Sequence, residues 1–397
     1  MNVRLGLKQN WQQFILLVII NGFVGGMVGL ERTILPEIAE TDFLIAAKTA
    51  ILSFIIVFGI TKAITNYYAG RLANKVGRKN LLVLGWLIGL PVPIILIFAP
   101  SWEWVVFANI LLGINQGLTW SSTVVMKIDL VGEGNRGFAM GMNESAGYLA
   151  VGIVAFFTGW IAMEHGLRPY PFYLGIGMAG VGFLSSMLLV KDTLHHVNLE
   201  TSVSNIPKLK NIFWETTWKN HNLGSITQAG LVNNLNDGMI WGILPILLAS
   251  KGFNLTEIAK IVATYPLVWG SGQLITGKLS DHFNKKWMLF WGMFVQSVAI
   301  ISMLLVSSFN AFVASAVLLG IGTAIVYPTF LSAIAGYTHP QQRPNSIGVF
   351  RLWRDLGYAI GALLTGIIAD AFNLEWSVGF IAGLTFISAW IIWMRMD

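Results

Sequence analysis

Two ten-residue stretches decide the fold of this chain, GRLANKVGRK at Gly70–Lys79 and GKLSDHFNKK at Gly277–Lys286. They begin 207 residues apart. The tetrapeptide LLGI recurs at the same spacing, first at Leu111 and again at Leu318. Ordered matches at one spacing indicate that the chain contains an internal repeat.

The composition places this repeat in a membrane. The 397 residues are 55% apolar and only 11% charged, whereas soluble domains average about 25% charged residues. The chain has no cysteine, which excludes disulfides, iron–sulfur clusters and thiolate metal sites. We expect neither a cofactor nor a metal. The net charge of +6 does not indicate nucleic-acid binding, because the basic residues gather in alternate loops.

The hydropathy pattern predicts an all-α integral membrane protein with twelve transmembrane helices. The first apolar segment is longer than the core of a signal peptide, which spans about 7–15 residues, so we expect a retained span. The expected spans are 12–36, 45–70, 81–99, 103–128, 137–162, 171–190, 223–250, 257–277, 287–306, 310–336, 346–369 and 375–394.

The repeat divides these spans into two pseudo-symmetric six-helix bundles, at 1–190 and 223–397, joined by a cytoplasmic linker at 191–222. Adjacent His195 and His196 are more typical of solvated linker residues than of a metal site. A short amphipathic helix on the inner membrane surface, or else an ordinary linker, is expected from the spacing of Ile206, Leu209, Ile212, Phe213 and Trp214.

The distribution of basic residues predicts a multi-pass protein of the inner (plasma) membrane with both termini cytoplasmic. The loops on the opposite side hold only a few, such as Arg168 and Lys251. The predicted inside loops and tails hold Arg4, Lys8, Arg71, Lys75, Arg78, Lys79, Arg136, Lys191, Lys208, Lys210, Lys219, Lys278, Lys285, Lys286, Arg343 and Arg395.

The stretch GRLANKVGRK resembles the signature loop GxLaDrxGrk of the major facilitator superfamily. It departs at Asn74, where the family has Asp, whereas the second copy keeps the acid as Asp281 and has Asn284 where a glycine is expected. The number of spans, the internal repeat and the loop motifs all match the family, so the resemblance covers essentially the whole chain. It implies two parallel six-helix repeats, a known transporter plan, but it does not indicate a substrate.

The resemblance also implies a role for the loop. Gly70, Gly77 and Gly277 allow close helix approach or a tight turn. In the family, the loop acid and arginines latch onto an acid at the end of span four. Asp129 stands at that place, so the resemblance predicts an Arg78–Asp129 pair, with Asn74 a weakened member.

Two motifs of exporters in this family are altered. NILLGINQG has Asn109 where an arginine is typical, and GMNESAGYLAVG, at Gly141–Gly152, lacks the usual proline. Both departures weigh against a drug exporter.

Span eleven contains the stretch FRLWRDLGYAIG, at Phe350–Gly361. Charges inside a bilayer are costly and therefore need a partner or a task. Arg351, Arg354 and Asp355 are expected to form an inner gate in which Lys62 of span two pairs with Asp355. An internal Arg351–Asp355 pair is the alternative.

Glu144 in span five is the repeat counterpart of Arg354, because Gly147-Tyr148 recurs 210 residues later as Gly357-Tyr358. A carboxylate at this depth must pair, protonate or face water. The sequence leaves two roles equally open for Glu144: it could carry a proton, or it could form a salt bridge with Arg354.

Further polar residues within the spans are candidates for a coupling site. Asp237 in span seven lies among Asn233, Asn234 and Asn236, which suits proton coupling or recognition of a polar group, although such amides also join helices. Span one carries Glu31 and Arg32 in its outer third.

A central cavity between the repeats is expected to be lined by amides and aromatic rings. Helix packing is the alternative role for each of them. The candidates are Asn115, Gln116, Trp120, Tyr148, Tyr327 and Tyr358.

These features predict a proton-coupled secondary transporter of a small solute, working by alternating access as a monomer in the lipid bilayer. An uncoupled facilitator is the alternative. A membrane-embedded enzyme is disfavoured, because the sequence has no HExxH motif, no Cys–His set and no phosphate-binding glycine loop. A membrane-embedded sensor would be expected to carry an added soluble domain. The sequence does not decide whether the substrate is a drug-like compound, an amphiphilic compound or a metabolite. It also leaves the direction of transport open.

Overall fold

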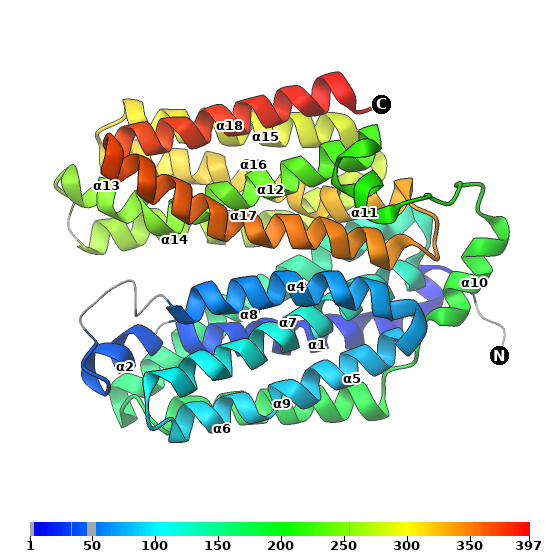
Figure 1. Ribbon diagram of the computed structural model, residues 1–397, viewed down its shortest axis with the longest axis horizontal. Helices are drawn as coiled ribbons and strands as arrows, with labels where there is room; N and C mark the ends of the chain where they lie inside the picture. The colour runs from blue at the N-terminus through cyan, green and yellow to red at the C-terminus, as the bar shows by residue number, and fades with distance from the viewer. Residues whose placement is uncertain (1–3, 33, 46–52, 254) are drawn as a thin grey trace. The chain divides into compact units, whose positions relative to one another are not determined.

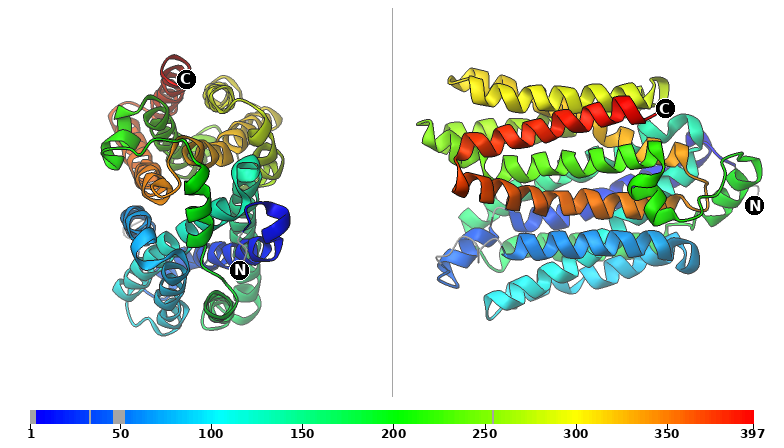
Figure 2. Two further views of the ribbon diagram at one scale, coloured as in Figure 1. Left: turned by 90° about the vertical axis from the view of Figure 1, so that its right-hand side faces the viewer. Right: turned by 45° about the horizontal axis from the view of Figure 1, so that its top comes forward.

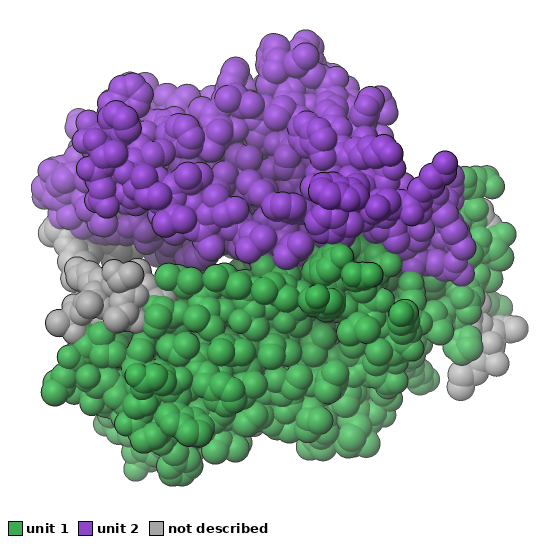
Figure 3. Space-filling view, viewed as in Figure 1, with its two compact units in different colours: residues 1–132, 145–205, 343–348 green, residues 133–144, 206–342, 349–397 purple. Residues whose placement is uncertain are grey.

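The computed structural model describes residues 4–32, 34–45, 53–253 and 255–397, and within these ranges it contains helices and no strand (Figure 1). Contacts divide the chain into two compact units, which are coloured separately in Figure 3. Unit 1 comprises residues 1–132, 145–205 and 343–348. Unit 2 comprises residues 133–144, 206–342 and 349–397.

Unit 1 is a bundle of long helices that run side by side (Figure 2). Its centre is α7, which packs against α1, α4 and α5, while α9 covers α1 and α5. The elements are α1 (Leu7–Arg32), α2 (Leu35–Thr41), α4 (Ser53–Val76), α5 (Arg78–Gly89), α6 (Pro91–Phe98), α7 (Trp102–Val131), most of α8 (Arg136–His165), α9 (Tyr170–Leu188) and α10 (Leu194–Val203).

Unit 2 is built on the same plan, with α16 packed against α14 and α15, and α18 against α12 and α15. Its elements are η1 (Glu133–Asn135), the start of α8, α11 (Ile212–Trp214), a π-helical turn (Glu215–Lys219), α12 (His221–Gly242), α13 (Leu244–Ser250), α14 (Leu255–His282), α15 (Lys285–Leu305), α16 (Phe309–Tyr337), most of α17 (Arg343–Ala371) and α18 (Leu374–Arg395).

Each of the twelve predicted spans falls on one helix or on two helices in succession, and the all-α membrane fold is confirmed. The predicted start of span two, at 46–52, lies outside the described residues. Proline follows the breaks in spans three and seven, at Pro91 and Pro245, because its ring cannot continue a helical hydrogen-bond ladder. Side-chain caps begin several helices of unit 2, as where Asn284 accepts hydrogen bonds from the N–H groups of Lys286 and Trp287.

Hydropathy separates the long helices into two groups. Among the described residues, eight segments are long and apolar enough to cross a membrane. The long helices α4, α7, α12 and α14 fall outside that group. These four carry several of the polar residues that the sequence singled out, among them Lys62, Asp129 and Asp237.

Of the segment 206–214, for which a short helix or an ordinary linker was expected, only the end is helical, at α11. Another helix of the linker is α10, at Leu194–Val203, and the chain is not helical from Ser204 to Asn211. Pro207 explains the gap, because a residue that precedes proline is disfavoured in the helical region. The unit boundary falls between Asn205 and Ile206. The predicted domain limits at 190 and 223 stay a prediction.

Candidate functional site

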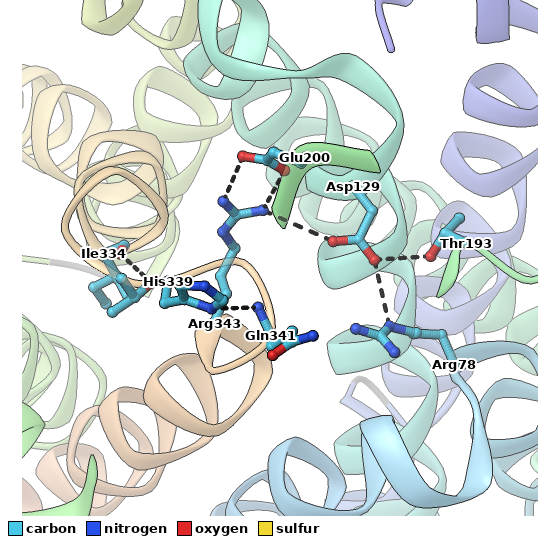
Figure 4. A network of polar contacts seen from close by, with 9 residues as sticks. Arg78, Asp129, Thr193, Glu200, Ile334, His339, Gln341 and Arg343 are labelled. Carbon is cyan, nitrogen blue, oxygen red and sulfur yellow. Dashed lines mark hydrogen bonds and ion pairs between the residues drawn. The ribbon is translucent and has the colours of Figure 1, made fainter. Parts of the chain in front are cut away.

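A network of buried charges surrounds the first signature loop (Figure 4). Arg78, the first residue of α5, places Nε 3.4 Å from Oδ2 of Asp129 on α7. The hydroxyl of Thr193, just before α10, donates to the same carboxylate at 2.8 Å. The structure thus contains the Arg78–Asp129 pair that the sequence predicted, and it adds Thr193.

Arg343, the first residue of α17, extends this network. Its Nη1 lies 3.8 Å from Oδ1 of Asp129. The two terminal nitrogens also donate to the two carboxylate oxygens of Glu200 on α10, at 3.1 and 2.8 Å. Such a two-pronged arginine–carboxylate contact is among the stronger and more directional hydrogen-bonded pairs in proteins.

The network is balanced in charge, with two guanidinium groups and two carboxylates. The side chains of Arg78, Asp129 and Arg343 are fully buried and that of Glu200 is 12% exposed. Removing one member of a buried network leaves the others uncompensated, which is strongly destabilising. Sequence reasoning missed Thr193, Glu200 and Arg343 as members, because they come from separate parts of the chain.

The second signature loop holds its acid differently. Asp281, near the end of α14, accepts hydrogen bonds from the backbone N–H groups of Gly137 and Phe138 at 2.6 and 2.9 Å. These two residues form the first turn of α8, where N–H groups lack helical partners and favour a negative charge. Burial raises the pKa of the Asp281 carboxyl, and the two backbone donors oppose that rise.

Glycines of the two loops make equivalent close contacts. A Cβ atom on Gly70 would collide with Pro344 and Gly348, and one on Gly277 would collide with Gly137 and Gly141. The first loop helix therefore touches the first turns of α17, and the second those of α8, at backbone distance. Gly77 adopts a φ of 92°, a left-handed conformation that favours glycine.

A cation and aromatic rings form a cluster inside unit 1. The Lys62 ammonium lies 5.2 Å from the ring centre of Trp120 and 5.6 Å from that of Phe58, which is cation–π range. The rings of Trp120 and Tyr148 are 5.3 Å apart. This cluster joins α4, α7 and α8.

Two predicted cavity residues of unit 1 form hydrogen bonds that join helices. Asn115 donates to the carbonyl of Gly85 at 2.9 Å, and Gln116 donates to the carbonyl of Val24 at 2.7 Å. Both amides are fully buried. Their observed contacts fit the packing role that the sequence left open.

A longer cluster occupies unit 2 and contains a carboxylate. The Tyr265 hydroxyl on α14 donates to Asp237 on α12 at 2.5 Å, and it lies 3.3 Å from the hydroxyl of Thr323. The Tyr265 ring stacks on Trp269, whose ring centre is 5.0 Å from that of Tyr327. Sequence reasoning missed Tyr265 and Trp269.

Arg354 continues the unit 2 cluster on α17. Its guanidinium lies 5.6 Å from the ring centre of Tyr327. Nε and Nη2 both donate to Oδ1 of Asp355, at 2.8 and 2.6 Å. Asp237 is 5% exposed and Arg354 is 3% exposed, so both charges are buried.

The acid of α8 pairs with a different arginine from the one expected. Glu144 Oε1 lies 3.6 Å from Nη2 of Arg351, both fully buried, while Arg354 pairs with Asp355. The alternative pair of Arg351 with Asp355 is therefore not the arrangement found. Lys62 and Asp355 belong to different units, and their pairing stays a prediction.

The remaining candidates lie as follows. Glu31 is 2% exposed and Asn233 is fully buried, with its amide 3.4 Å from the side-chain oxygen of Asn234. Tyr358 and Tyr148 are partly exposed. The side chain of Arg32 lies outside the described residues, and Asn74 is exposed. Among the described residues, no group of three or more metal-binding side chains occurs.

Helix contacts show that Glu31 and Asp237 occupy equivalent places. In unit 1, Gly25 and Gly29 of α1 touch the backbone of Gly147 and Val151 on α8. In unit 2, Leu231 and Leu235 of α12 touch the counterparts Gly357 and Gly361 on α17. The two matched pairs are each 206 residues apart, as are Glu31 and Asp237.

The residue at the position of Tyr265 differs between the units. Gly113 packs against the carbonyl of Phe58, just as Gly320, 207 residues later, packs against the carbonyl of Tyr265. Phe58 is therefore the counterpart of Tyr265. It has no hydroxyl with which to donate a hydrogen bond.

Comparisons with known proteins agree with this arrangement. A family model described as "Major Facilitator Superfamily" matches residues 14–229 and, a second time, residues 226–397. The chain is 25% identical over 388 residues to the "Proton-coupled antiporter flippase LtaA" of Staphylococcus haemolyticus, covering 93% of this chain and 89% of that protein.

Solved structures show the same fold. The transporter FucP in its outward conformation is similar with a TM-score of 0.78 and 13% identity, over 97% of this chain and 98% of FucP. The human organic anion transporter MFSD10 gives a TM-score of 0.77 and 14% identity, over 96% and 99% of the two chains.

Proposed function

The chain belongs to the major facilitator superfamily and is a membrane transporter rather than an enzyme, and we propose that it couples proton movement to the transport of a small amphiphilic solute by alternating access. Asp237 is the proton-carrying group in this proposal. The single observation that carries it is the buried contact between Asp237 and the hydroxyl of Tyr265.

A buried carboxylate on a membrane helix is costly unless it is paired, protonated or functional. Asp237 accepts a hydrogen bond from a phenol rather than from a fixed cation, so its charge can change without leaving an arginine unpaired in that contact. Glu144 and Asp355, in contrast, are held in ion pairs with arginines. This difference supports Asp237 as the carrier in preference to those two acids.

The aromatic clusters suit a solute with both polar and apolar parts. Lys62 with Trp120 in unit 1, and Arg354 with Tyr327 in unit 2, combine a cation with an aromatic face. Such surfaces bind an apolar body and orient a polar group at the same time. The similarity to a protein named as a proton-coupled antiporter flippase supports an amphiphilic solute.

An uncoupled facilitator is the second candidate. The observation that favours it is that Glu144, Asp355, Arg351 and Arg354 form two ion pairs, which is the arrangement expected if the charges act only as gates. A facilitator would move its solute down a gradient with no proton movement.

Reconstituted vesicles that enclose a pH-sensitive dye separate the two candidates. A thermal-shift screen against metabolites and drugs first selects a ligand, because binding to the folded state raises its stability. A ligand gradient should move protons with the wild-type chain, whereas Asp237→Asn should exchange ligand with no proton movement. Glu103→Gln, at an exposed acid, is the matched control.

Proton movement retained in Asp237→Asn would refute the assignment of the carrier. Ligand movement without protons in the wild-type chain would establish the facilitator.

The proposal also includes the orientation of the chain in the membrane and its oligomeric state. The excess of lysine and arginine in the predicted inside loops supports cytoplasmic termini. On this orientation the network around Asp129 lies on the cytoplasmic side. We further propose that the transporter works as a monomer.

A further inference from the structure

We propose that Glu200, in the linker helix α10, supplies the carboxylate that the first signature loop lacks, and thereby positions Arg343 at the start of α17. The inference rests on the proposed alternating-access cycle, in which the start of α17 must move. It concerns a residue outside both six-helix repeats.

The first step is the missing acid. Asp281 lies four residues after Gly277, and Asn74 lies four residues after Gly70. The two glycines make equivalent contacts with the first turns of α8 and α17. Positions four apart share a helix face, so residue 74 stands where a carboxylate would face the start of α17. An asparagine there carries no charge.

The second step concerns the start of α17 itself. Pro344 lies four residues before Gly348, as Gly137 lies four residues before Gly141. Proline has no N–H group, so α17 lacks the donor that Gly137 gives to Asp281. A positive group at this place is the Arg343 guanidinium, which is fully buried.

The third step is the geometry of Glu200. Both of its carboxylate oxygens accept from Arg343, at 2.8 and 3.1 Å (Figure 4). Asp129 alone cannot neutralise this site, because it faces Arg78 as well as Arg343. Glu200 therefore completes the charge balance of the buried network.

The fourth step is that α10 is held firmly enough to present Glu200. Thr193 donates to Asp129, and Oδ2 of Asp192 accepts from the backbone N–H of Lys79 at 2.9 Å. His196 lies within hydrogen-bond distance of Asn10 on α1, at 3.2 Å. These contacts dock α10 on α1, α5 and α7, so Arg343 can leave the network only if its bond to α10 breaks.

The test measures access to the start of α17 in the full chain in lipid nanodiscs. Ser346 is fully buried and the chain has no native cysteine, so Ser346→Cys gives a single labelling site. The probe is a water-soluble maleimide, and no substrate is needed. In this background Glu200→Gln should raise the labelling rate roughly tenfold or more, the factor expected when a charge-assisted hydrogen bond is lost.

Two further variants separate positioning from mere structure. Glu200→Asp keeps the charge and should return most of the protection. Asn74→Asp, added to Glu200→Gln, restores the acid of the family signature and should return at least part of it. Glu133→Gln, an exposed acid in η1, is the matched control and should leave the rate unchanged.

A labelling rate unaffected by Glu200→Gln would overturn the proposal, as would a raised rate that Asn74→Asp leaves unchanged. In vesicles, a transport rate altered by Glu200→Gln and recovered with Asn74→Asp would support it. Failure of proton coupling with normal labelling results would refute the proposed function alone, because the labelling assay requires neither protons nor solute.

Discussion

The two signature loops are related in sequence, yet they hold their charges in different ways. The second loop uses one carboxylate, Asp281, against two backbone N–H groups of α8. The first uses Arg78, Asp129, Glu200 and Arg343, taken from four separate elements. The glycine contacts are the same in both. The two repeats thus share the close helix approach, whereas the partners that compensate their charged groups differ.

The membrane-embedded clusters differ in the same manner. Glu31 and Asp237 occupy equivalent places, but Phe58 stands in unit 1 where Tyr265 stands in unit 2. The absence of a hydroxyl at residue 58 is thus one difference between the two sites. The comparison indicates that the frame of each repeat tolerates changes in charge and polarity at equivalent positions.

Asp129→Asn should produce the largest effect on stability. It removes a carboxylate that faces two buried guanidinium groups and accepts from Thr193. Breaking a buried ion network by removing one partner costs about 3–5 kcal/mol. Chemical unfolding in detergent checks the value, with Glu133→Gln as the control. A loss below about 1 kcal/mol is the usual range of an exposed pair. Such a loss would show that the charged contacts of the first loop contribute no more to the free energy of unfolding than those of the second.

Tyr265→Phe should have the next largest effect, because it gives unit 2 the residue found in unit 1. Loss of a hydrogen bond to a charged group costs about 1.5–3 kcal/mol. The same unfolding assay measures the change, and proton movement in vesicles should fall with it. The reciprocal Phe58→Tyr is the control and should leave proton movement intact. If both variants behave alike, the two sites are not functionally distinct.

Asp281→Asn should cost less than Asp129→Asn, because an amide oxygen can still accept one of the two N–H groups. Removal of a helix-capping carboxylate typically costs about 0.5–2 kcal/mol. Chemical unfolding measures the difference, with Lys278→Gln, at an exposed position, as the control. A cost equal to that of Asp129→Asn would remove the contrast between the loops.

Acidification should have the smallest effect, through His196 of the helix α10 that docks beside the first loop. Burial, and then the nearby charge of His195, lower the pKa of His196 below its usual value. A lowered folded-state pKa means that the docking of α10 is favoured above about pH 6.5, the ordinary histidine value, and weakens as the pH falls through the folded-state pKa.

A spin label at Leu199, which is exposed on α10, should therefore become more mobile as the pH falls from 7.5 to 5.5. His196→Gln supplies an amide that can meet Asn10 and removes the titration. It should flatten the response, and a response that persists in this variant would point to another group.

The sequence predicted the parts of the fold that depend on local pattern. Twelve apolar stretches marked the helices, and the spacing of Gly70 and Gly277 marked the repeat. The Arg78–Asp129 pair was predicted because the family resemblance implies both partners, an arginine of the signature loop and an acid at the end of span four. Glu200 was not, since a linker glutamate has no neighbours in sequence that indicate a distant arginine.

The repeat spacing chosen from the sequence explains why Arg354, rather than Arg351, was considered as the partner of Glu144. The spacing of 210 residues, taken from Gly147 and Gly357, matches Glu144 with Arg354. At the starts of α8 and α17 the glycine contacts are 207 residues apart, which matches Glu144 with Arg351, its observed partner. Tyr265 was missed for a related reason, because only the structural match to Phe58 singles out its hydroxyl.

The uneven hydropathy of the helices has a consequence for biogenesis. Among the described helices, α4, α7, α12 and α14 are long but less apolar than the eight that qualify as membrane spans on their own. Polar and charged residues raise the free energy of inserting a helix into lipid. We expect these four to enter the bilayer together with apolar neighbours, as α7 would with α5 and α14 with α16. The residues proposed for transport would then set the order in which the newly made chain assembles.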